Sequence, residues 1–208
     1  MRYGHVIFDL DGTIINNDFV ILQSLQDTLR ELKGRNYSHD EMHMALGVPS
    51  YVPLRHFGVS NIPEAIKRWA SNMAAYADKV QPFPEVEELI SELRVAGVNL
   101  GIVTSRRRDE YVTDFLPFGL HPLFGTVICA DDTFRHKPEP EPILAYLEQS
   151  NTEKGDAIYI GDSQYDMECA NAAGVDGGHA IWARNREKHP KAKYHFNTAD
   201  ELRKLLFS

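Results

Sequence analysis

Carboxylate side chains stand at the ends of apolar runs that are typical of buried strands. Asp9 and Asp11 close the β-rich run at 5–10, and Asp162 follows the run at 157–160. A short run of this kind, bounded by polar residues and glycine, predicts a strand buried in a sheet. Carboxylates that gather without partners repel one another, and a cation relieves that repulsion. An oxygen-rich group suits Mg²⁺, so these three acids are candidates for a magnesium site.

The chain from Pro84 onward alternates predicted helices and strands. Helices are expected at 85–96, 109–115, 140–149, 164–173 and 199–206, and strands at 98–103, 124–129, 157–160 and 179–183. Strands separated by helices predict an α/β fold, with a parallel Rossmann-like sheet flanked by helices. Ligands of such sheets bind outside the carboxyl ends of the strands. The acids, with Thr104 and Ser105 at the end of another strand, are therefore expected to converge on one crevice.

Residues 15–81 follow a different pattern, in which helices dominate and no strong strand signal occurs. Apolar residues recur at helical spacing over 18–33, Ser38 and Glu41 have the spacing of a capping box, and a third helix is expected over 63–78. The first strand most simply belongs to the same sheet as the later strands. The predicted organisation is an α/β core domain, 1–14 and 82–208, with a small all-α domain, 15–81, inserted after strand 1.

Composition narrows the class of partner. The 208 residues carry 22 Lys and Arg against 30 Asp and Glu, a formal net charge of −8. Nucleic acid is not expected as a partner, because its recognition needs a basic surface. The two cysteines lack CxxC spacing, which favours a reducing cytoplasm. No apolar run approaches the ~18 residues of a membrane span, so no membrane partner is expected. The oligomeric state stays open between monomer and homodimer.

Four short segments follow one another in a fixed order along the chain. They are Phe8-Asp9-Leu10-Asp11-Gly12-Thr13, Ile102-Val103-Thr104-Ser105, Lys137 within His136–Pro142, and Gly161-Asp162-Ser163-Gln164-Tyr165-Asp166. The set resembles the four motifs of the haloacid dehalogenase-like (HAD) superfamily: DxDGT, a strand ending in Thr or Ser, a lysine, and GDxxxD. The resemblance covers most of residues 5–175, and the ordered set is far more specific than DxDGT alone.

The resemblance implies roles for the acids. Asp9 would be the nucleophile that attacks phosphorus and forms an aspartyl-phosphate, and Asp11 would act first as general acid and then as general base. The Asp9 side chain, the Asp11 backbone carbonyl and Asp162 would bind Mg²⁺. Asp166 would either bind the metal or orient Lys137, and we favour the second role.

The resemblance also implies a phosphate site. The Thr104 hydroxyl and the Ser105 backbone N–H would donate to phosphoryl oxygens. Lys137 would contact a phosphate oxygen and Asp9, and would stabilise the transition state by its charge. Gly12 is counted with the phosphate-binding residues, because it permits the tight turn that places both acids in one site.

The helical insertion resembles the cap of the family, which closes over the active site and selects the substrate. The break at Gly47, Val48 and Pro49 resembles the family's specificity loop, and Arg55 nearby would meet a second anionic group. An ordinary turn and a solvated arginine are the alternative interpretation.

Other polar clusters are given structural interpretations. The run Arg106–Arg108 is interpreted as a solvated helix start rather than a phosphate-recruiting patch. His39 and His43 have i, i+4 spacing, but no Glu follows His39 directly and no third ligand is evident, so a solvated helix face is favoured over a metal site.

The resemblance as a whole implies an enzyme: a Mg²⁺-dependent phosphatase that acts on a small phosphorylated metabolite through an aspartyl-phosphate. The closest members are phosphoglycolate phosphatase-like and pyrophosphatase-like. Asp11 favours phosphoryl transfer from oxygen, since dehalogenases lack an Asp at that position. A sugar-phosphate phosphomutase and a non-catalytic phosphometabolite-binding module remain as alternatives.

Overall fold

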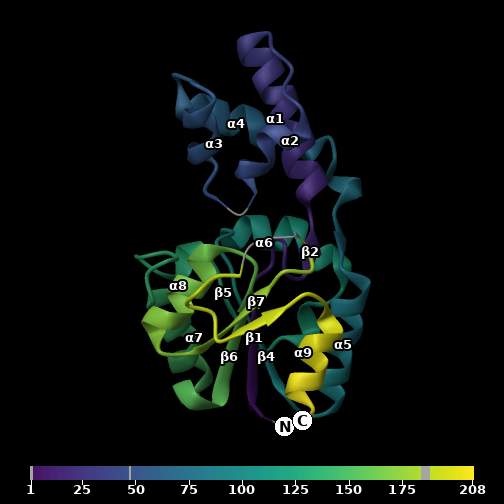
Figure 1. Ribbon diagram of the computed structural model, residues 1–208, viewed down its shortest axis with the longest axis vertical. Coiled ribbons are helices and arrows are strands. Elements are labelled where there is room, and N and C mark those ends of the chain that lie inside the picture. The colour runs from purple at the N-terminus through teal and green to yellow at the C-terminus, as the bar shows by residue number, and fades with distance from the viewer. Residues whose placement is uncertain (1, 47, 184–187) are drawn as a thin grey trace. The chain divides into compact units, whose positions relative to one another are not determined.

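The computed structural model describes residues 2–46, 48–183 and 188–208. The chain divides into two compact units, which are coloured by residue number in Figure 1. The sheet unit is formed by Met1–Ile15 and Pro82–Ser208, and the helical unit by Asn16–Gln81. Among the described residues, no helix has the length and apolar character needed to cross a membrane.

The sheet unit is built on a six-stranded parallel sheet in the order β5-β4-β1-β6-β7-β8. The strands are β1 (His5–Phe8), β4 (Asn99–Val103), β5 (Thr126–Ile128), β6 (Ala157–Gly161), β7 (Asp176–Ala180) and β8 (Tyr194–Phe196). Strand β1 lies between β4 and β6, with Val6 opposite Leu100 and Ile158. The predicted parallel α/β fold is confirmed, and the strand order reverses at β1, where open sheets of this class bind ligands.

Helices cover both faces of this sheet. They are α5 (Pro84–Val95), α6 (Arg108–Asp114), α7 (Glu141–Ser150), α8 (Gln164–Ala173) and α9 (Ala199–Leu206). Helix α5 packs against α9, and α7 against α8; Figure 1 shows these two pairs on opposite sides of the sheet. Short 3₁₀ turns lie at Leu116–Phe118, His121–Leu123, Ala130–Asp132 and Lys154–Asp156.

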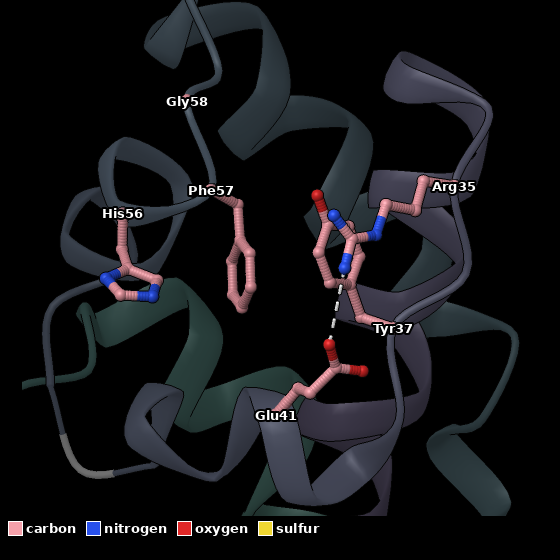
Figure 2. A pocket seen from close by; sticks show the side chains of 6 residues that line it. All are labelled: Arg35, Tyr37, Glu41, His56, Phe57 and Gly58. Atoms are coloured by element: carbon pink, nitrogen blue, oxygen red, sulfur yellow. Dashed lines mark hydrogen bonds and ion pairs between the residues drawn. The ribbon is translucent and has the colours of Figure 1, made fainter.

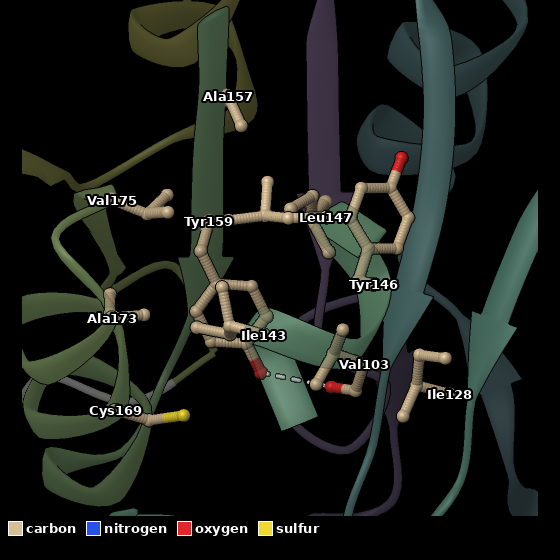
Figure 3. Packing of buried hydrophobic residues seen from close by; sticks show 12 residues of the cluster. Val103, Ile128, Ile143, Tyr146, Leu147, Ala157, Tyr159, Cys169, Ala173 and Val175 are labelled. Carbon is tan, nitrogen blue, oxygen red and sulfur yellow. Dashed lines mark hydrogen bonds between the residues drawn. The ribbon is translucent and has the colours of Figure 1, made fainter. Parts of the chain in front are cut away.

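One buried cluster joins the sheet to α7 and α8. Ile7, Val103, Ile128 and Tyr159 from four neighbouring strands meet apolar side chains of both helices (Figure 3). Strands buried on both faces read as nearly continuous apolar runs, which is why the sequence pattern located them.

Two strands differ from the sequence expectation. Strand β7 begins at Asp176, three residues before the predicted start, and its first residues include two glycines. A side chain at Gly178 would meet Ile160 Cδ1 at 2.6 Å and Phe196 at 2.7 Å, so the glycine lets neighbouring side chains pack over the strand. Strand β8, which was not predicted, has three residues and therefore too little length to show a period.

The helical unit contains α1 (Asp18–Lys33), α2 (His39–Met42), α3 (Tyr51–His56) and α4 (Ile62–Ala74), with 3₁₀ turns at His43–Ala45 and Ala77–Lys79. Its core is formed by side chains that include Leu25, Leu29, Met42, Leu54 and Trp69. The Ser38–Glu41 capping box is present. Helix α3 was not predicted, and the third predicted helix ends at Ala74 instead of Asp78.

A two-stranded ribbon of β2 (Ile15–Asn16) and β3 (Gln81–Pro82) lies where the chain leaves and re-enters the sheet unit. This ribbon was not predicted, because two residues per strand are too few to show an alternating pattern.

Candidate active site

A tight turn after β1 carries Asp9 and Asp11. The carbonyl of Leu10 accepts hydrogen bonds from the N–H groups of Thr13, Ile14 and Ile15, at 3.2, 2.9 and 2.9 Å. Gly12 has a φ of 77°, a left-handed conformation that costs an L-residue with a Cβ about 1–2 kcal/mol. Asp9 is buried, and its N–H donates to the Ile160 carbonyl on the neighbouring strand at 2.8 Å.

Lys137 joins two carboxylates at the carboxyl ends of the strands. Its Nζ donates to Asp9 Oδ1 and to Asp166 Oδ1, both at 2.7 Å. The three side chains are almost completely buried, so the two contacts act in a medium of low polarity. The lysine therefore neutralises part of the negative charge of this group of acids.

Asp166 is held by a capping arrangement at the start of α8. Its Oδ2 accepts from the N–H of Ser163 at 2.9 Å and from the Ser163 hydroxyl, while its own N–H donates back to Ser163 Oγ. Its Oδ1 accepts from Lys137 and from the hydroxyl of Tyr159 at 2.9 Å. Four donors of the described part of the chain thus fix this carboxylate and point it at Lys137.

Three buried acids gather at this point. Asp9, Asp162 and Asp166 each offer a carboxylate oxygen, and these oxygens lie within 4.8 Å of one another. Hard oxygen donors at this spacing, with more negative charge than Lys137 balances, suit a divalent cation such as Mg²⁺. The donor set therefore fits a magnesium ion.

The pKa values follow from burial and from the lysine. Burial raises the pKa of Asp9 well above its usual range; Lys137 opposes the rise, and neighbouring carboxylates add to it. Burial also acts to raise the pKa of Asp166, but Lys137 and Ser163 outweigh it, so that pKa is lowered. Burial opposes the charge of Lys137, yet Asp166 and Asp9 raise its pKa and keep it a cation. A further cation would favour the ionised form of Asp9.

Thr104 and Ser105 follow β4 at the same edge of the sheet. Thr104 is buried, its N–H donates to the Ile128 carbonyl at 3.0 Å, and its Oγ1 accepts from the N–H of Arg106 at 3.2 Å. A hydroxyl that accepts still has its own hydrogen to donate. Ser105 is exposed.

The interpretation of Arg106 as a solvated residue is wrong. Only 12% of its side chain is exposed, and it forms ion pairs with Asp11 and Asp114. Its Nε donates to Asp11 Oδ2 at 2.8 Å and its Nη2 to Asp11 Oδ1 at 2.7 Å. Arg107, at 64% exposure, is solvated as expected. Sequence spacing within the run cannot distinguish neighbours that point in different directions.

Two more residues that the sequence interpretation did not single out contact this group. The Tyr159 hydroxyl reaches Asp166, and His179 Nε2 donates to the backbone carbonyl of Asp162 at 3.0 Å. A signal existed for Tyr159: it is the one phenol in an otherwise aliphatic run at 157–160, and a buried phenol needs a hydrogen-bond partner.

The helical unit holds the residues predicted to set specificity. Gly47 lies outside the described residues. Val48 is half-buried and Pro49 exposed, while Arg55 is exposed and its guanidinium lies 5.4 Å from the centre of the Tyr51 ring.

A surface pocket of about 460 Å³ lies elsewhere in the helical unit (Figure 2). It is lined by Arg35, Tyr37, Glu41, His56, Phe57 and Gly58. The Arg35 guanidinium lies 4.4 Å from the centre of the Tyr37 ring and pairs with Glu41 at 3.5 Å. The groups in the pocket already partner one another, and the predicted chemistry lies outside it.

Comparison with known proteins identifies the family. The model of a family described as haloacid dehalogenase-like hydrolase matches residues 6–178. The "Putative pyrophosphatase PpaX" of Caldanaerobacter subterraneus subsp. tengcongensis is 31% identical over 184 residues, 88% of this chain and 84% of that protein.

Solved structures agree with this match. The "putative phosphoglycolate phosphatase" of Lactobacillus plantarum superposes with a TM-score of 0.86 at 27% identity, covering 99% of this chain and 100% of that one. The "putative beta-phosphoglucomutase" of Thermotoga maritima, at 19% identity and a TM-score of 0.79 over 98% of each chain, shares the fold. The motifs, the sheet that carries them and the match over 6–178 lead to one conclusion: the chain belongs to the haloacid dehalogenase-like hydrolase family.

Proposed function

We propose that the protein is a Mg²⁺-dependent phosphatase that hydrolyses a small phosphorylated metabolite through an aspartyl-phosphate on Asp9. The observation that supports it most is the arrangement of Asp9, Lys137 and Asp166, with both lysine contacts at 2.7 Å in a buried site. A lysine fixed beside a carboxylate at the strand ends is suited to bind a phosphoryl group that the carboxylate attacks.

In the first step, a carboxylate oxygen of Asp9 forms a bond to phosphorus while the bond from phosphorus to the leaving oxygen breaks. Asp11, two residues further along, gives its proton to that oxygen. Lys137 and the Thr104 hydroxyl donate to the phosphoryl oxygens and stabilise their charge, and the Ser105 N–H adds a donor.

In the second step, Asp11 takes a proton from water, whose oxygen then bonds to phosphorus. The bond from phosphorus to Asp9 breaks and phosphate leaves, so both acids return to their starting states. Asp166 keeps its contact with Lys137 throughout, in the orienting role favoured for it.

The Asp9 side chain, the Asp11 backbone carbonyl and Asp162 are the proposed ligands of Mg²⁺. When bound, the ion supplies positive charge that offsets the acids and the phosphoryl group. This assignment leaves Asp166 to Lys137, consistent with its four donors among the described residues.

For the substrate we propose phosphoglycolate-like or pyrophosphate-like anions, as the names of the matched proteins suggest. We further propose that the helical unit is the cap, and that Val48, Pro49, Gly47 and Arg55 contribute to selectivity. It is a separate compact unit inserted between Asp11 and Thr104 in the sequence, where the family's helical cap is expected.

A phosphomutase is the second reading. The fold shared with the Thermotoga protein is compatible with it but does not favour it, since 19% identity carries the fold alone. Membership of the family, together with the assembly of the acids and the lysine in one site, argues against a non-catalytic binding module.

We propose a cytoplasmic location, which is supported by two buried cysteines that are free thiols. For the oligomeric state we propose a monomer or a homodimer.

A phosphoester panel with Mg²⁺ tests the function. We expect the protein to release phosphate from at least one of 2-phosphoglycolate, pyrophosphate, sugar phosphates and nucleotides. Asp9→Asn should abolish release, while Asp131→Asn, an exposed acid outside the site, should not. Quenched reactions should show phosphate on the peptide that contains Asp9. Sugar-phosphate isomerisation faster than phosphate release would instead establish the mutase, and full activity in Asp9→Asn would refute the mechanism.

A further inference from the structure

We propose that Tyr159 is a positioning residue: its hydroxyl fixes Asp166 and its ring supports Lys137, so that the ammonium group stays against Asp9. The inference rests on the proposed function, because Lys137 is assigned there to the phosphoryl group. It adds a residue outside the four motifs to the reaction.

Tyr159 lies in the middle of the sheet, on β6, and is completely buried. Figure 3 shows its ring among the side chains between the sheet and α7, with the hydroxyl directed at the Val103 carbonyl. That oxygen belongs to the last residue of β4, directly before Thr104, on the far side of β1. The hydroxyl thus reaches the strand end that carries another predicted phosphate ligand.

The same hydroxyl lies 2.9 Å from Asp166 Oδ1 and 2.9 Å from the Val103 carbonyl. A phenol has one hydrogen, and a hydrogen bond to a charged carboxylate is the stronger of the two. Burial raises the pKa of Tyr159, and the negative charge of Asp166 raises it further. The hydroxyl therefore keeps its hydrogen and remains a donor. Without this hydroxyl, Asp166 Oδ1 and the Val103 carbonyl oxygen would both lose a hydrogen-bond donor that lies between them.

The ring acts on the lysine directly. Lys137 Nζ lies 5.2 Å from the centre of the Tyr159 ring, within the range of a cation–π contact. Asp9 and Asp166 hold the same ammonium group by hydrogen bonds at 2.7 Å. Tyr159 therefore contacts both Lys137, through its ring, and Asp166, through its hydroxyl.

A hydrophobic role alone does not account for this geometry. Phenylalanine would fill the same space, whereas a buried hydroxyl is costly unless it is bonded. Tyr146 offers a comparison within the same core cluster: it is equally buried, and its hydroxyl lies 3.1 Å from His5 Nδ1, with no contact to Lys137 or Asp166 among its described bonds. Its ring packs over Gly101.

The test compares Tyr159→Phe with the matched control Tyr146→Phe, using the phosphoester that the parent hydrolyses best in Mg²⁺. Both variants lose one buried hydroxyl and keep the ring. For Tyr159→Phe we expect kcat to fall about tenfold with KM changed less than about twofold. The variant loses a hydrogen bond to the charged Asp166, which positions Lys137 to stabilise the transition state. Tyr146→Phe should retain the parental kcat.

Binding of two anions gives a readout that a loss of stability would not produce. Orthovanadate mimics the transition state of phosphoryl transfer, and inorganic phosphate mimics the product. We expect Tyr159→Phe to weaken inhibition by orthovanadate about tenfold and inhibition by phosphate far less. Equal weakening of both would overturn the positioning role.

A double-mutant cycle tests the route through Asp166. If the hydroxyl acts through that carboxylate, adding Tyr159→Phe to Asp166→Asn should lower kcat less than about twofold further. A full additional tenfold loss would overturn the inference, as would equal kcat values in Tyr159→Phe and Tyr146→Phe. If the parent releases no phosphate from any ester, the proposed function fails and this inference fails with it. If the parent is active and Tyr159→Phe has the same kcat as Tyr146→Phe, only this inference fails.

Discussion

Arg106 donates a hydrogen bond to each carboxylate oxygen of Asp11, from Nε to Oδ2 at 2.8 Å and from Nη2 to Oδ1 at 2.7 Å. The third nitrogen, Nη1, pairs with Asp114 on α6, so the fork is anchored to a helix. A bidentate pair of this kind fixes orientation as well as charge. The two hydrogen bonds from Arg106 therefore determine the position of the Asp11 carboxylate, which is the proposed acid and base.

The first prediction concerns this fork. Arg106→Gln should lower kcat more for an alkyl phosphate than for p-nitrophenyl phosphate. An alkoxide needs a proton from Asp11 as it leaves, whereas nitrophenolate departs without one, so misplacing the acid affects only the first substrate strongly. We expect kcat to fall roughly a hundredfold for the alkyl phosphate and about tenfold or less for p-nitrophenyl phosphate. Arg107→Gln, an exposed neighbour, serves as the control, and equal losses on both substrates would contradict the role assigned to Arg106.

The second prediction concerns the metal. Chelation of divalent cations should abolish phosphate release, and added Mg²⁺ should restore it. Because a ligand that binds the folded state alone raises stability, Mg²⁺ at ~100 times its Kd should stabilise the protein by about 2.7 kcal/mol. Asp162→Asn should remove most of this gain, seen as a smaller rise in Tm. Asp78→Asn, on an exposed acid of the helical unit, should keep it. An unchanged rise in Asp162→Asn would exclude Asp162 as a ligand.

The third prediction separates backbone strain from catalysis. Gly12 and Gly97 both have positive φ, 77° and 81°, so replacement by Ala should cost each about 1–2 kcal/mol of stability. A Cβ at Gly97 meets nothing within 4 Å, and that residue follows α5. Urea unfolding should show similar losses in both variants. Phosphate release should fall in Gly12→Ala only, because only that turn carries Asp9 and Asp11; a matching fall in Gly97→Ala would mean that stability alone controls activity.

The fourth prediction is a pH dependence of stability. Burial lowers the pKa of His5 below its ordinary value of 6.5, and Asp156 opposes the shift only in part. The folded state therefore binds a proton less readily than the unfolded state, so this contribution is present above pH 6.5 and is lost as the pH falls through the folded pKa. Urea unfolding at pH 7.5 and 5.5 should show a smaller loss of stability in His5→Gln than in the parent. Identical losses in the two proteins would show that His5 does not contribute.

Much of the fold followed from local patterns. The helices α1, α8 and α9 have the predicted bounds, because apolar periodicity and end signals lie within the segment itself. The predicted start of strand β7 was three residues too late, because the glycines at its start carry no apolar pattern. Only the neighbouring side chains show why a glycine is needed there: Ile160 and Phe196 occupy the space above Gly178.

The order of the motifs and the kind of side chain at each strand end can be predicted from the sequence alone, since both depend on residues close together in the chain. The pairings between these side chains depend on the folded structure. Arg106 binds Asp11 across 95 positions, and Lys137 reaches Asp9 across 128 and Asp166 across 29. Burial turns these contacts into strong ones, because charges removed from water must find partners. Which arginine of a run turns inward, and which buried phenol meets a carboxylate, is settled by strands packed side by side and is invisible in local spacing.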